Sequence, residues 1–444
     1  MADGLVIDLG QDLSRIDVDR PFPRRSLRAL AVALVLSVAL AGDAGPVASA
    51  FVVLATVPVS GPAEVALGSN RVFVADRADS VVGGHTWQGE VLAYPLPGRS
   101  ARWRTRVPQV AEQLSFVPGA GVVLATMQGG GAGAAQTVAL DADTGRLLWS
   151  SASAVFLHAP AGGTGGLLFD GAASRAVVRW VDLRTGRTIW SRAVPAGGTI
   201  NWLYGASVTD PAWVLMEGPD GVELVAEESG AVFTNSVLAG GGLNGTSGRQ
   251  QIPDQVNVVG DRVLVLRSAG QGGSTLTAFD LATFTRQWTL TGGFVGYPNA
   301  CGPLICLAGV NGGLTAVDLA AGTVTWHTGG WQSGQMIDAD HLLAHGSQGG
   351  ATMGVLDVRT GRVVVRMSGW TPVPDPAVGL SRLVVRPDTR QDDSSWFAMI
   401  DPRHGAPAPL GELPGLLWQY CQSTGDLLTC PTVHDTVQVW RLRT

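Results

Sequence analysis

The sequence contains no lysine, so all 30 basic residues are arginine. Charged residues of both signs make up only 15% of the 444 residues, and the formal net charge is −6. No block of basic residues occurs after residue 28. Because nucleic-acid binding depends on clustered cations that neutralise phosphates, this composition argues against nucleic acid as a main partner.

Long amphipathic helical patterns are also missing beyond residue 50. The chain instead has 60 glycines, 25 prolines and 45% hydrophobic residues, which indicates short strands joined by tight turns. A chain of 444 residues is too long for one ordinary hydrophobic core, so it predicts several domains or a repeat array.

The only long apolar run lies near the amino terminus, at residues 29–42, and Arg24, Arg25 and Arg28 precede it. This run is shorter than the roughly 20 residues of a typical membrane-spanning helix. We interpret residues 1–28 as a cytoplasmic polar tail and residues 29–50 as an apolar helix, either a signal anchor or a signal peptide.

The segment Val47–Ala50 has the small-x-small pattern of a cleavage site. We expect a single-pass protein of the cell membrane with residues 51–444 outside, and the alternative is a secreted protein cleaved near Ala50. The tail could also dock a partner as a short linear motif.

Only four cysteines occur, in two close pairs: Cys301 with Cys306, and Cys421 with Cys430. An even number of cysteines in an exported domain predicts disulfides, so we expect one bridge within each pair.

A hairpin motif recurs about every 40 residues, which is the period of β-propeller repeats. Its copies combine an Asp, a Gly four residues later and a Trp four residues after that. The positions are Asp141, Gly145 and Trp149; Asp182, Gly186 and Trp190; Asp280 and Trp288, with Phe284 in place of Gly; Asp318, Gly322 and Trp326; Asp357 and Gly361, with Val365 in place of Trp; and Asp401 with Gly405. Weaker copies have Tyr94 or Ala226 at the Asp position.

Each motif residue has a structural interpretation. The Asp carboxylate accepts backbone hydrogen bonds across the turn, and the Gly supplies the positive φ that a tight hairpin requires. The Trp returns on the partner strand and packs against the neighbouring blade. We therefore interpret the repeated tryptophans as packing residues rather than as a stacking surface for a ligand.

The fold class predicted is an all-β propeller of four-stranded blades over residues 51–444. The chain ends with three strands of a blade, and the strand at Phe51–Ser60 can complete that blade and close the ring. We favour eight blades over nine, with the copy at Ala226 as an irregular insertion, and we expect a monomer. Each cysteine pair falls across the first hairpin of its blade.

The motif A-x-D-x-x-T-G-x-x-x-W, most complete at residues 139–149, 181–190 and 316–326, resembles the tryptophan-docking repeat of pyrroloquinoline-quinone-like propellers. That family includes quinoprotein alcohol dehydrogenases and cofactor-free propellers, and this chain is most similar to the exported actinobacterial members without a cofactor. No two cysteines are adjacent, as the disulfide of those dehydrogenases requires, and no C-x-x-C-H haem motif is present. We therefore expect no cofactor.

Most of the other candidate sites have a structural rather than a functional interpretation. The repeat places His341 and His345 on one strand, about 13 Å apart, which is too far for both to bind one metal ion directly, so we expect no metal site. The glycine-rich stretch 129–133 and the pair Asp392 and Asp393 are interpreted as loops. The long segment Val237–Gln255 is the best candidate for a binding loop.

The sequence thus predicts a non-catalytic extracytoplasmic propeller, membrane-tethered, that presents loops to a protein or cell-envelope partner. Two alternatives stay open: a degenerate quinoprotein dehydrogenase, and an extracellular sensor that signals through residues 1–28.

Overall fold

The chain divides into two units, Met1–Ser49 and Ala50–Thr444, of which only the second is described by the computed structural model. The described residues are 50–443 except 62, 78–88, 128–134, 153, 161, 172–175, 197, 204–212, 219–220, 235–254, 271, 347–351, 376–378, 388–393 and 403–404. The tail at 1–28 and the apolar helix expected within 29–50 therefore lie outside the described residues, apart from Ala50. Within the described part of the chain, no helix is long and apolar enough to cross a bilayer.

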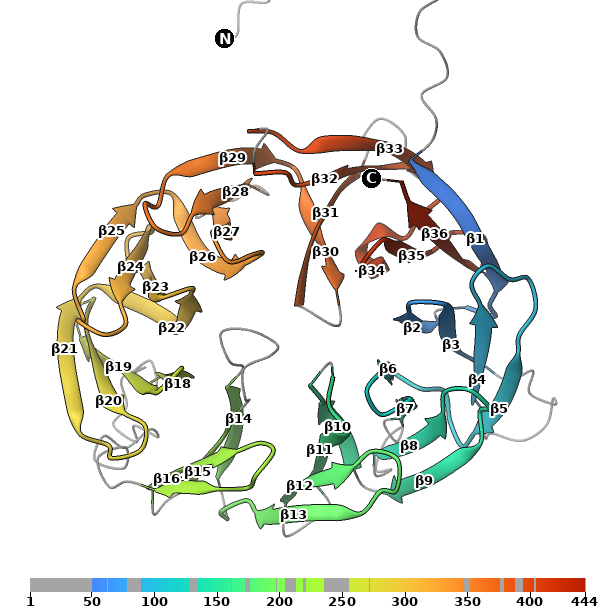
Figure 1. Ribbon diagram of the computed structural model, residues 1–444, viewed down its shortest axis with the longest axis horizontal. Coiled ribbons are helices and arrows are strands. Elements are labelled where there is room, and N and C mark those ends of the chain that lie inside the picture. The colour runs from blue at the N-terminus through green and yellow to red at the C-terminus, as the bar shows by residue number, and fades with distance from the viewer. Residues whose placement is uncertain are drawn as a thin grey trace, which may run out of the picture. The chain divides into compact units, whose positions relative to one another are not determined.

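The described residues form nine four-stranded antiparallel sheets, which are the blades of a propeller (Figure 1). Blades 1 to 3 comprise β2 (Glu64–Gly68), β3 (Arg71–Arg77), β4 (Gly89–Pro95) and β5 (Trp103–Val107); β6 (Gln113–Val117), β7 (Val122–Met127), β8 (Gln136–Asp141) and β9 (Leu147–Ala152); and β10 (Ala154–His158), β11 (Gly165–Asp170), β12 (Val177–Asp182) and β13 (Thr188–Ala193). Blades 4 to 6 comprise β14 (Thr199–Leu203), β15 (Trp213–Gly218), β16 (Gly221–Ala226) and β17 (Val232–Thr234); β18 (Gln255–Val259), β19 (Arg262–Gly270), β20 (Gly273–Asp280) and β21 (Arg286–Gly292); and β22 (Phe294–Cys301), β23 (Leu304–Gly309), β24 (Leu314–Asp318) and β25 (Val324–Thr328).

The remaining blades complete the ring. Blades 7 to 9 comprise β26 (Trp331–Met336), β27 (His341–Gly346), β28 (Thr352–Asp357) and β29 (Val363–Ser368); β30 (Thr371–Asp375), β31 (Gly379–Pro387), β32 (Ser394–Met399) and β33 (Ala408–Pro414); and β34 (Gln422–Thr424), β35 (Leu427–Pro431), β36 (Thr436–Leu442) and β1 (Phe51–Pro58). A single 3-10 turn, η1 (Trp418–Tyr420), precedes β34 in the described chain.

The all-β propeller with four-stranded blades is confirmed, but the preference for eight blades is wrong. The unit at Ala226, expected to be an irregular insertion, forms the complete blade 4. Its last hairpin closes without an Asp, through backbone bonds from Ala226 N to Ala231 O (2.9 Å) and from Gly230 N to Ala226 O (2.8 Å). The hairpin at Asp141 makes the same two backbone bonds, so the Asp carboxylate is not required for the turn.

The amino-terminal strand closes the ring as the sequence predicted. β1 pairs with β36 in antiparallel register, from Phe51 opposite Leu442 to Pro58 opposite Thr436. It becomes the outer strand of blade 9, in the order β1-β36-β35-β34. Pairing the two ends of the ring in this way removes an open sheet edge, where other chains could add.

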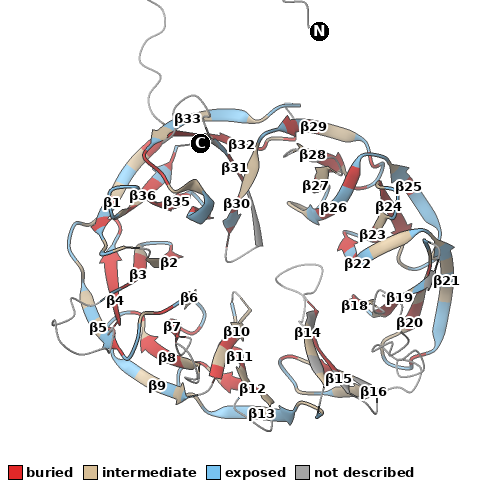
Figure 2. Ribbon diagram, turned by 180° about the vertical axis from the view of Figure 1, so that it is seen from behind, coloured by how far each residue is buried: buried red, intermediate tan, exposed pale blue. Residues whose placement is uncertain are grey.

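The hydrophobic core lies between blades. In Figure 2 the buried residues gather mainly on the second and third strands of the blades, and the outermost strands are largely exposed or intermediate. Each pair of neighbouring blades shares its own buried cluster; Val122, Leu124, Phe156 and Leu183, for example, lie between blades 2 and 3. Burying one such aliphatic or aromatic side chain stabilises the fold by roughly 1.5–3 kcal/mol. The stability of the ring is therefore distributed over the interfaces between neighbouring blades, which we call seams.

Candidate binding site

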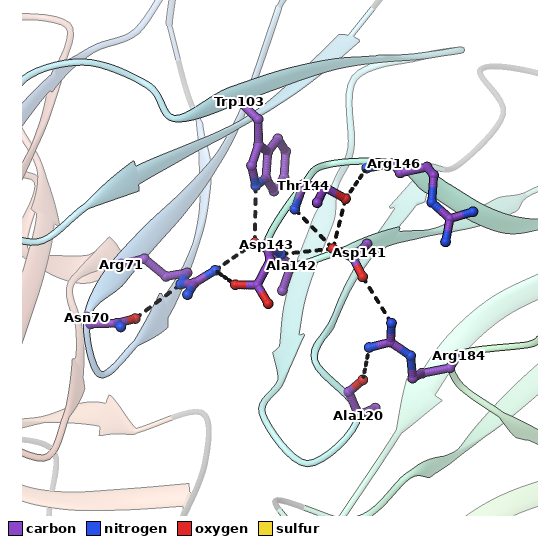
Figure 3. Close-up of polar contacts among 10 residues, drawn as sticks. All are labelled: Asn70, Arg71, Trp103, Ala120, Asp141, Ala142, Asp143, Thr144, Arg146 and Arg184. Atoms are coloured by element: carbon purple, nitrogen blue, oxygen red, sulfur yellow. Dashed lines mark hydrogen bonds and ion pairs between the residues drawn. The ribbon is translucent and has the colours of Figure 1, made fainter.

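Five of the repeated hairpins are built around an Asp carboxylate. Asp141 Oδ1 accepts hydrogen bonds from Thr144 N (3.0 Å), Thr144 Oγ1 (2.9 Å) and Asp143 N (3.1 Å), as Figure 3 shows. The same carboxylate-to-turn bonds occur in other blades, at Asp182, Asp280, Asp318 and Asp357. The hydrogen bond from the Thr185 hydroxyl, with backbone N–H groups, holds the pKa of Asp182 below its usual value despite partial burial.

These hairpins also tie one blade to the next (Figure 3). Asp141 Oδ2 accepts a hydrogen bond from Arg184 Nη2 of blade 3 at 3.1 Å. From the other side, Arg71 of blade 1 donates to Ala142 O at 2.8 Å and forms an ion pair with Asp143 at 2.7 Å. The hairpin at Asp141 therefore links blades 1, 2 and 3 through arginine hydrogen bonds and ion pairs.

Each repeated tryptophan docks on the following blade. Its indole Nε1 donates to the backbone carbonyl of the residue that follows the third strand of that blade. The pairs are Trp103 with Ala142 (3.1 Å), Trp149 with Leu183 (2.7 Å), Trp190 with Glu227 (2.8 Å), Trp288 with Leu319 (3.0 Å) and Trp326 with Val358 (2.7 Å). The structure thus places these side chains between blades and not on an open ligand surface.

Two copies of the motif are placed differently from the sequence alignment. The last residue of β4 is Pro95, so Pro95 rather than Tyr94 occupies the Asp position of blade 1. Asp401 lies two residues beyond the end of β32, because the last hairpin of blade 8 is longer, and Ile400 N donates to Arg382 O at that point.

Both predicted disulfides are present. Cys301–Cys306 joins β22 to β23, and Cys421–Cys430 joins the segment before β34 to β35. Each bridge therefore closes the first hairpin of its blade, and all four cysteines are buried. Within the described residues no cysteine is free.

A cavity of about 550 Å³ opens along the first strands of blades 4 to 7. Its polar lining consists of side-chain amides and one hydroxyl, and the rest is apolar or glycine. The lining residues are Asn201, Leu203, Asn257, Val295, Gly296, Asn299, Cys306, Ala308, Leu314, Gln332, Ser333 and Gly334.

Two irregular strands shape this cavity. The register of β22 against β23 shifts between Val295 and Asn299, so the intervening residues bulge from the sheet, and Gly296 has a φ of 74°. The register of β26 shifts between Trp331 and Ser333. β-bulges redirect side chains and widen the space beside a sheet, which explains why the cavity lies at these two strands.

The amides differ in their local roles. Asn257 is buried; its Nδ2 donates to Pro298 O at 2.7 Å and links blade 5 to blade 6. Asn299 and Gln332 are exposed at the cavity. Among the described residues none that lines the cavity is charged, so their ligand chemistry is that of neutral donors and acceptors together with apolar contacts.

The two histidines singled out in the sequence lie at opposite ends of β27, as the repeat predicted. His341 Nδ1 is hydrogen-bonded to Asp338 Oδ1 at 2.8 Å, and Asp338 also pairs with Arg382 of blade 8. His345 is half-buried, and burial lowers its pKa. Across the described ranges, no three His, Cys, Asp or Glu side chains group as metal ligands would.

Several candidates cannot be placed. The glycine-rich stretch 129–133, the pair Asp392 and Asp393 and nearly all of Val237–Gln255 lie outside the described residues. Sequence reasoning missed the cavity. The sequence feature that pointed to it was the set of side-chain amides within first strands, at Asn201, Asn257 and Asn299.

Blades, docked tryptophans and closing strand define a quinoprotein-type β-propeller. The family model described as outer membrane protein assembly factor BamB matches residues 87–328, which include strands β4 to β25. The chain belongs to this family, and the predicted relationship to pyrroloquinoline-quinone-like propellers is confirmed.

Solved structures similar to the chain are distant in sequence. BamB from Moraxella catarrhalis has 14% identity and a TM-score of 0.42, covering 88% of this chain and 100% of its own. The Dos1 propeller has 10% identity and a TM-score of 0.40, covering 88% of this chain and 96% of its own. The dihydro-heme d1 dehydrogenase NirN in complex with DHE has 13% identity and a TM-score of 0.38, covering 70% and 66%. No curated protein sequence matches the chain.

The cavity does not suit the quinone for which the repeat type is known. Pyrroloquinoline quinone carries three carboxylates, which require cationic partners once they leave water. None of the lining residues that the structure describes is charged, and the disulfide at the cavity, Cys301–Cys306, joins residues five positions apart rather than adjacent cysteines.

Proposed function

We propose that this chain is a non-catalytic propeller scaffold that binds an extended peptide segment of a protein partner in the cavity of blades 4 to 7. We further propose that it acts as a monomer held at the outer face of the cell membrane through residues 29–50. The observation that carries the binding role is the neutral, amide-lined cavity formed by the first strands of blades 4 to 7 together with β23 and β24 of blade 6.

The chemistry of the lining favours a peptide. A peptide main chain alternates N–H donors with C=O acceptors, and a side-chain amide offers both to it. Asn299 and Gln332 expose such amides, and apolar side chains such as Leu203 and Leu314 provide surface for the side chains of the ligand.

A glycan is the main alternative among cell-envelope ligands. Carbohydrate-binding surfaces gain much of their affinity from aromatic side chains that pack on sugar rings. None of the described residues that line the cavity is aromatic, which supports a peptide over a glycan.

The test uses the full chain, eight-residue uncharged peptides of alternating Ser and Val, and maltohexaose as the glycan probe. We expect saturable peptide binding to the wild-type chain. The affinity for the peptide should fall at least tenfold in Asn299→Ala and in Gln332→Ala. Gln109→Ala removes an exposed amide from the segment between blades 1 and 2 and serves as the matched control, with unchanged affinity. Binding of maltohexaose alone, or equal losses in all three variants, would contradict the proposal.

Tethering has its own measurement. The intact mass of the protein from the membrane fraction should include residues 1–50. A mature protein that lacks these residues and is found in the medium would contradict tethering and leave a secreted scaffold, whatever the result with peptides.

A further inference from the structure

One position in the repeat breaks an otherwise apolar pattern. The residue that directly follows the third strand packs into the seam with the preceding blade. In every other one of the first eight blades this residue is apolar: Leu96, Ala142, Leu183, Leu281, Leu319, Val358 and Ile400. In blade 4 it is Glu227, which follows β16.

The Glu227 side chain is nevertheless buried, with 1% of the residue exposed. Neither carboxyl oxygen accepts or donates a hydrogen bond among the described residues. Buried polar groups are nearly always hydrogen-bonded, and a buried carboxylate without partners is costly. An aliphatic residue would stabilise this interface between blades more than Glu227 does, so packing does not explain the carboxyl.

Two titratable groups face this carboxyl. His158, at the end of β10 in blade 3, places Nε2 3.9 Å from Glu227 Oε2, beyond hydrogen-bond distance. Glu228 follows in the same hairpin and is exposed. Burial, and then the charge of Glu228, raise the pKa of Glu227 to about 8, and burial lowers the pKa of His158. Near neutral pH the pair is therefore uncharged rather than an ion pair.

A metal does not account for the pair. Glu227 and His158 supply two ligands, whereas structural and catalytic zinc sites use three or four protein ligands. No third His, Cys, Asp or Glu joins them in the part of the chain that the structure describes.

The backbone of the same residue holds the seam together. Glu227 O accepts a hydrogen bond from the indole N–H of Trp190 at 2.8 Å. The residue on which blade 3 docks is therefore the same residue that carries the buried carboxyl. Gly230 of the same hairpin lies against the Trp190 ring. Ionisation of the carboxyl would draw water into the seam at the point where the indole is held.

We infer that Glu227, buried beside His158 at the seam between blades 3 and 4, is a proton-operated latch: it keeps blade 4 docked on blade 3 while protonated and releases the seam when its proton is lost. The sign follows from the two states. An open seam exposes Glu227 with an ordinary pKa near 4.5, and the closed seam retains the proton until about pH 8. Opening therefore becomes more favourable as pH rises from 4.5 to 8 and is constant above that. Below about pH 6.5 the opposite effect of His158 offsets this trend, because an exposed histidine gains a proton there.

Hydrogen exchange of the full chain, followed by mass spectrometry between pH 6.5 and 8.0 and corrected for intrinsic exchange, tests the latch. Protection of β15 and β16 should fall roughly tenfold over this range, while that of β23 and β24 in blade 6 stays constant. Glu227→Gln should abolish the fall. Glu227→Leu should abolish it and also raise protection, since Leu matches the other blades. Glu228→Gln, the exposed neighbour, should retain it.

Parallel behaviour of blades 4 and 6 in the wild-type chain would overturn the latch. A fall that persists in both Glu227 variants would do so as well. The measurement needs no ligand, so it is independent of the outcome of peptide binding.

Discussion

The Trp149 ring lies against Gly186 of the next blade, where an added Cβ would come within 2.7 Å of Trp149 Cγ. Gly186 also has a φ of 69°, a conformation that L residues with side chains disfavour. Two independent constraints therefore meet at this glycine. The turn needs its backbone freedom, and the docked indole needs the space that a side chain would fill.

Substitution of Gly186 by Ala should therefore cost more than backbone strain alone. We expect a loss of about 3 kcal/mol, of which roughly 1 kcal/mol comes from the left-handed backbone and the rest from displacement of the indole. Urea unfolding followed by tryptophan fluorescence measures this loss.

Gly405 provides the matched control. It lies in the last hairpin of blade 8 with a φ of 65°, but the preceding blade has Val365 in place of Trp, and the nearest atom to an added Cβ is 3.7 Å away. Gly405→Ala should cost only about 1 kcal/mol. Equal losses at the two positions would show that the indole contact adds nothing.

Acid should weaken the hairpins through their carboxylates. The Thr185 hydroxyl lowers the pKa of Asp182, so this group stabilises the fold above the pKa of an unfolded Asp, near 3.9, and the contribution is lost as pH falls through the lower folded value. Asp182→Asn should reduce stability at pH 7 by about 1 kcal/mol. Thermal unfolding at pH 7, 4 and 2.5 measures the difference between the two proteins.

That difference should shrink at the lowest pH, because the wild-type carboxyl is then protonated and differs little from the amide. A deficit of Asp182→Asn that stays constant down to pH 2.5 would contradict a role for the carboxylate charge.

The sequence predicted the features that repeat and not those that deviate. The Asp–Gly–Trp spacing, the cysteine pairs and the unpaired strand at residue 51 each had a local signal, and their arrangement followed from the geometry of a ring. The number of blades did not follow, because the Ala226 hairpin closes through its backbone without an Asp. A search for the motif depends on side chains such as this Asp, which a blade does not need in order to form.

The cavity and the latch were missed for a related physical reason. The cavity depends on a bulge between Val295 and Asn299, and a bulge has no strong sequence signal beyond its Gly296. Glu227 is unusual only after the repeat register is known, since an acidic residue in a turn is ordinary in itself. Its significance comes from burial, which the alignment alone did not provide.

The closing strand gives the last prediction. Val57 of β1 is fully buried opposite Val437, within the cluster shared by blades 9 and 1. Val57→Asp would place an unpaired carboxylate in this seam, and we expect a loss of at least 3 kcal/mol. Detachment of β1 would also leave the edge of β36 open to other chains, so the variant should form oligomers or aggregates visible in size-exclusion chromatography with light scattering.

Val53 on the same strand separates the effect of burial from that of strand pairing. It is 58% exposed and pairs with Trp440, so Val53→Asp retains the strand and should cost less than about 1 kcal/mol without a change in oligomeric state. A monomeric Val57→Asp protein with wild-type stability would mean that the ring holds without its closing strand, and the pairing of β1 with β36 would then be dispensable.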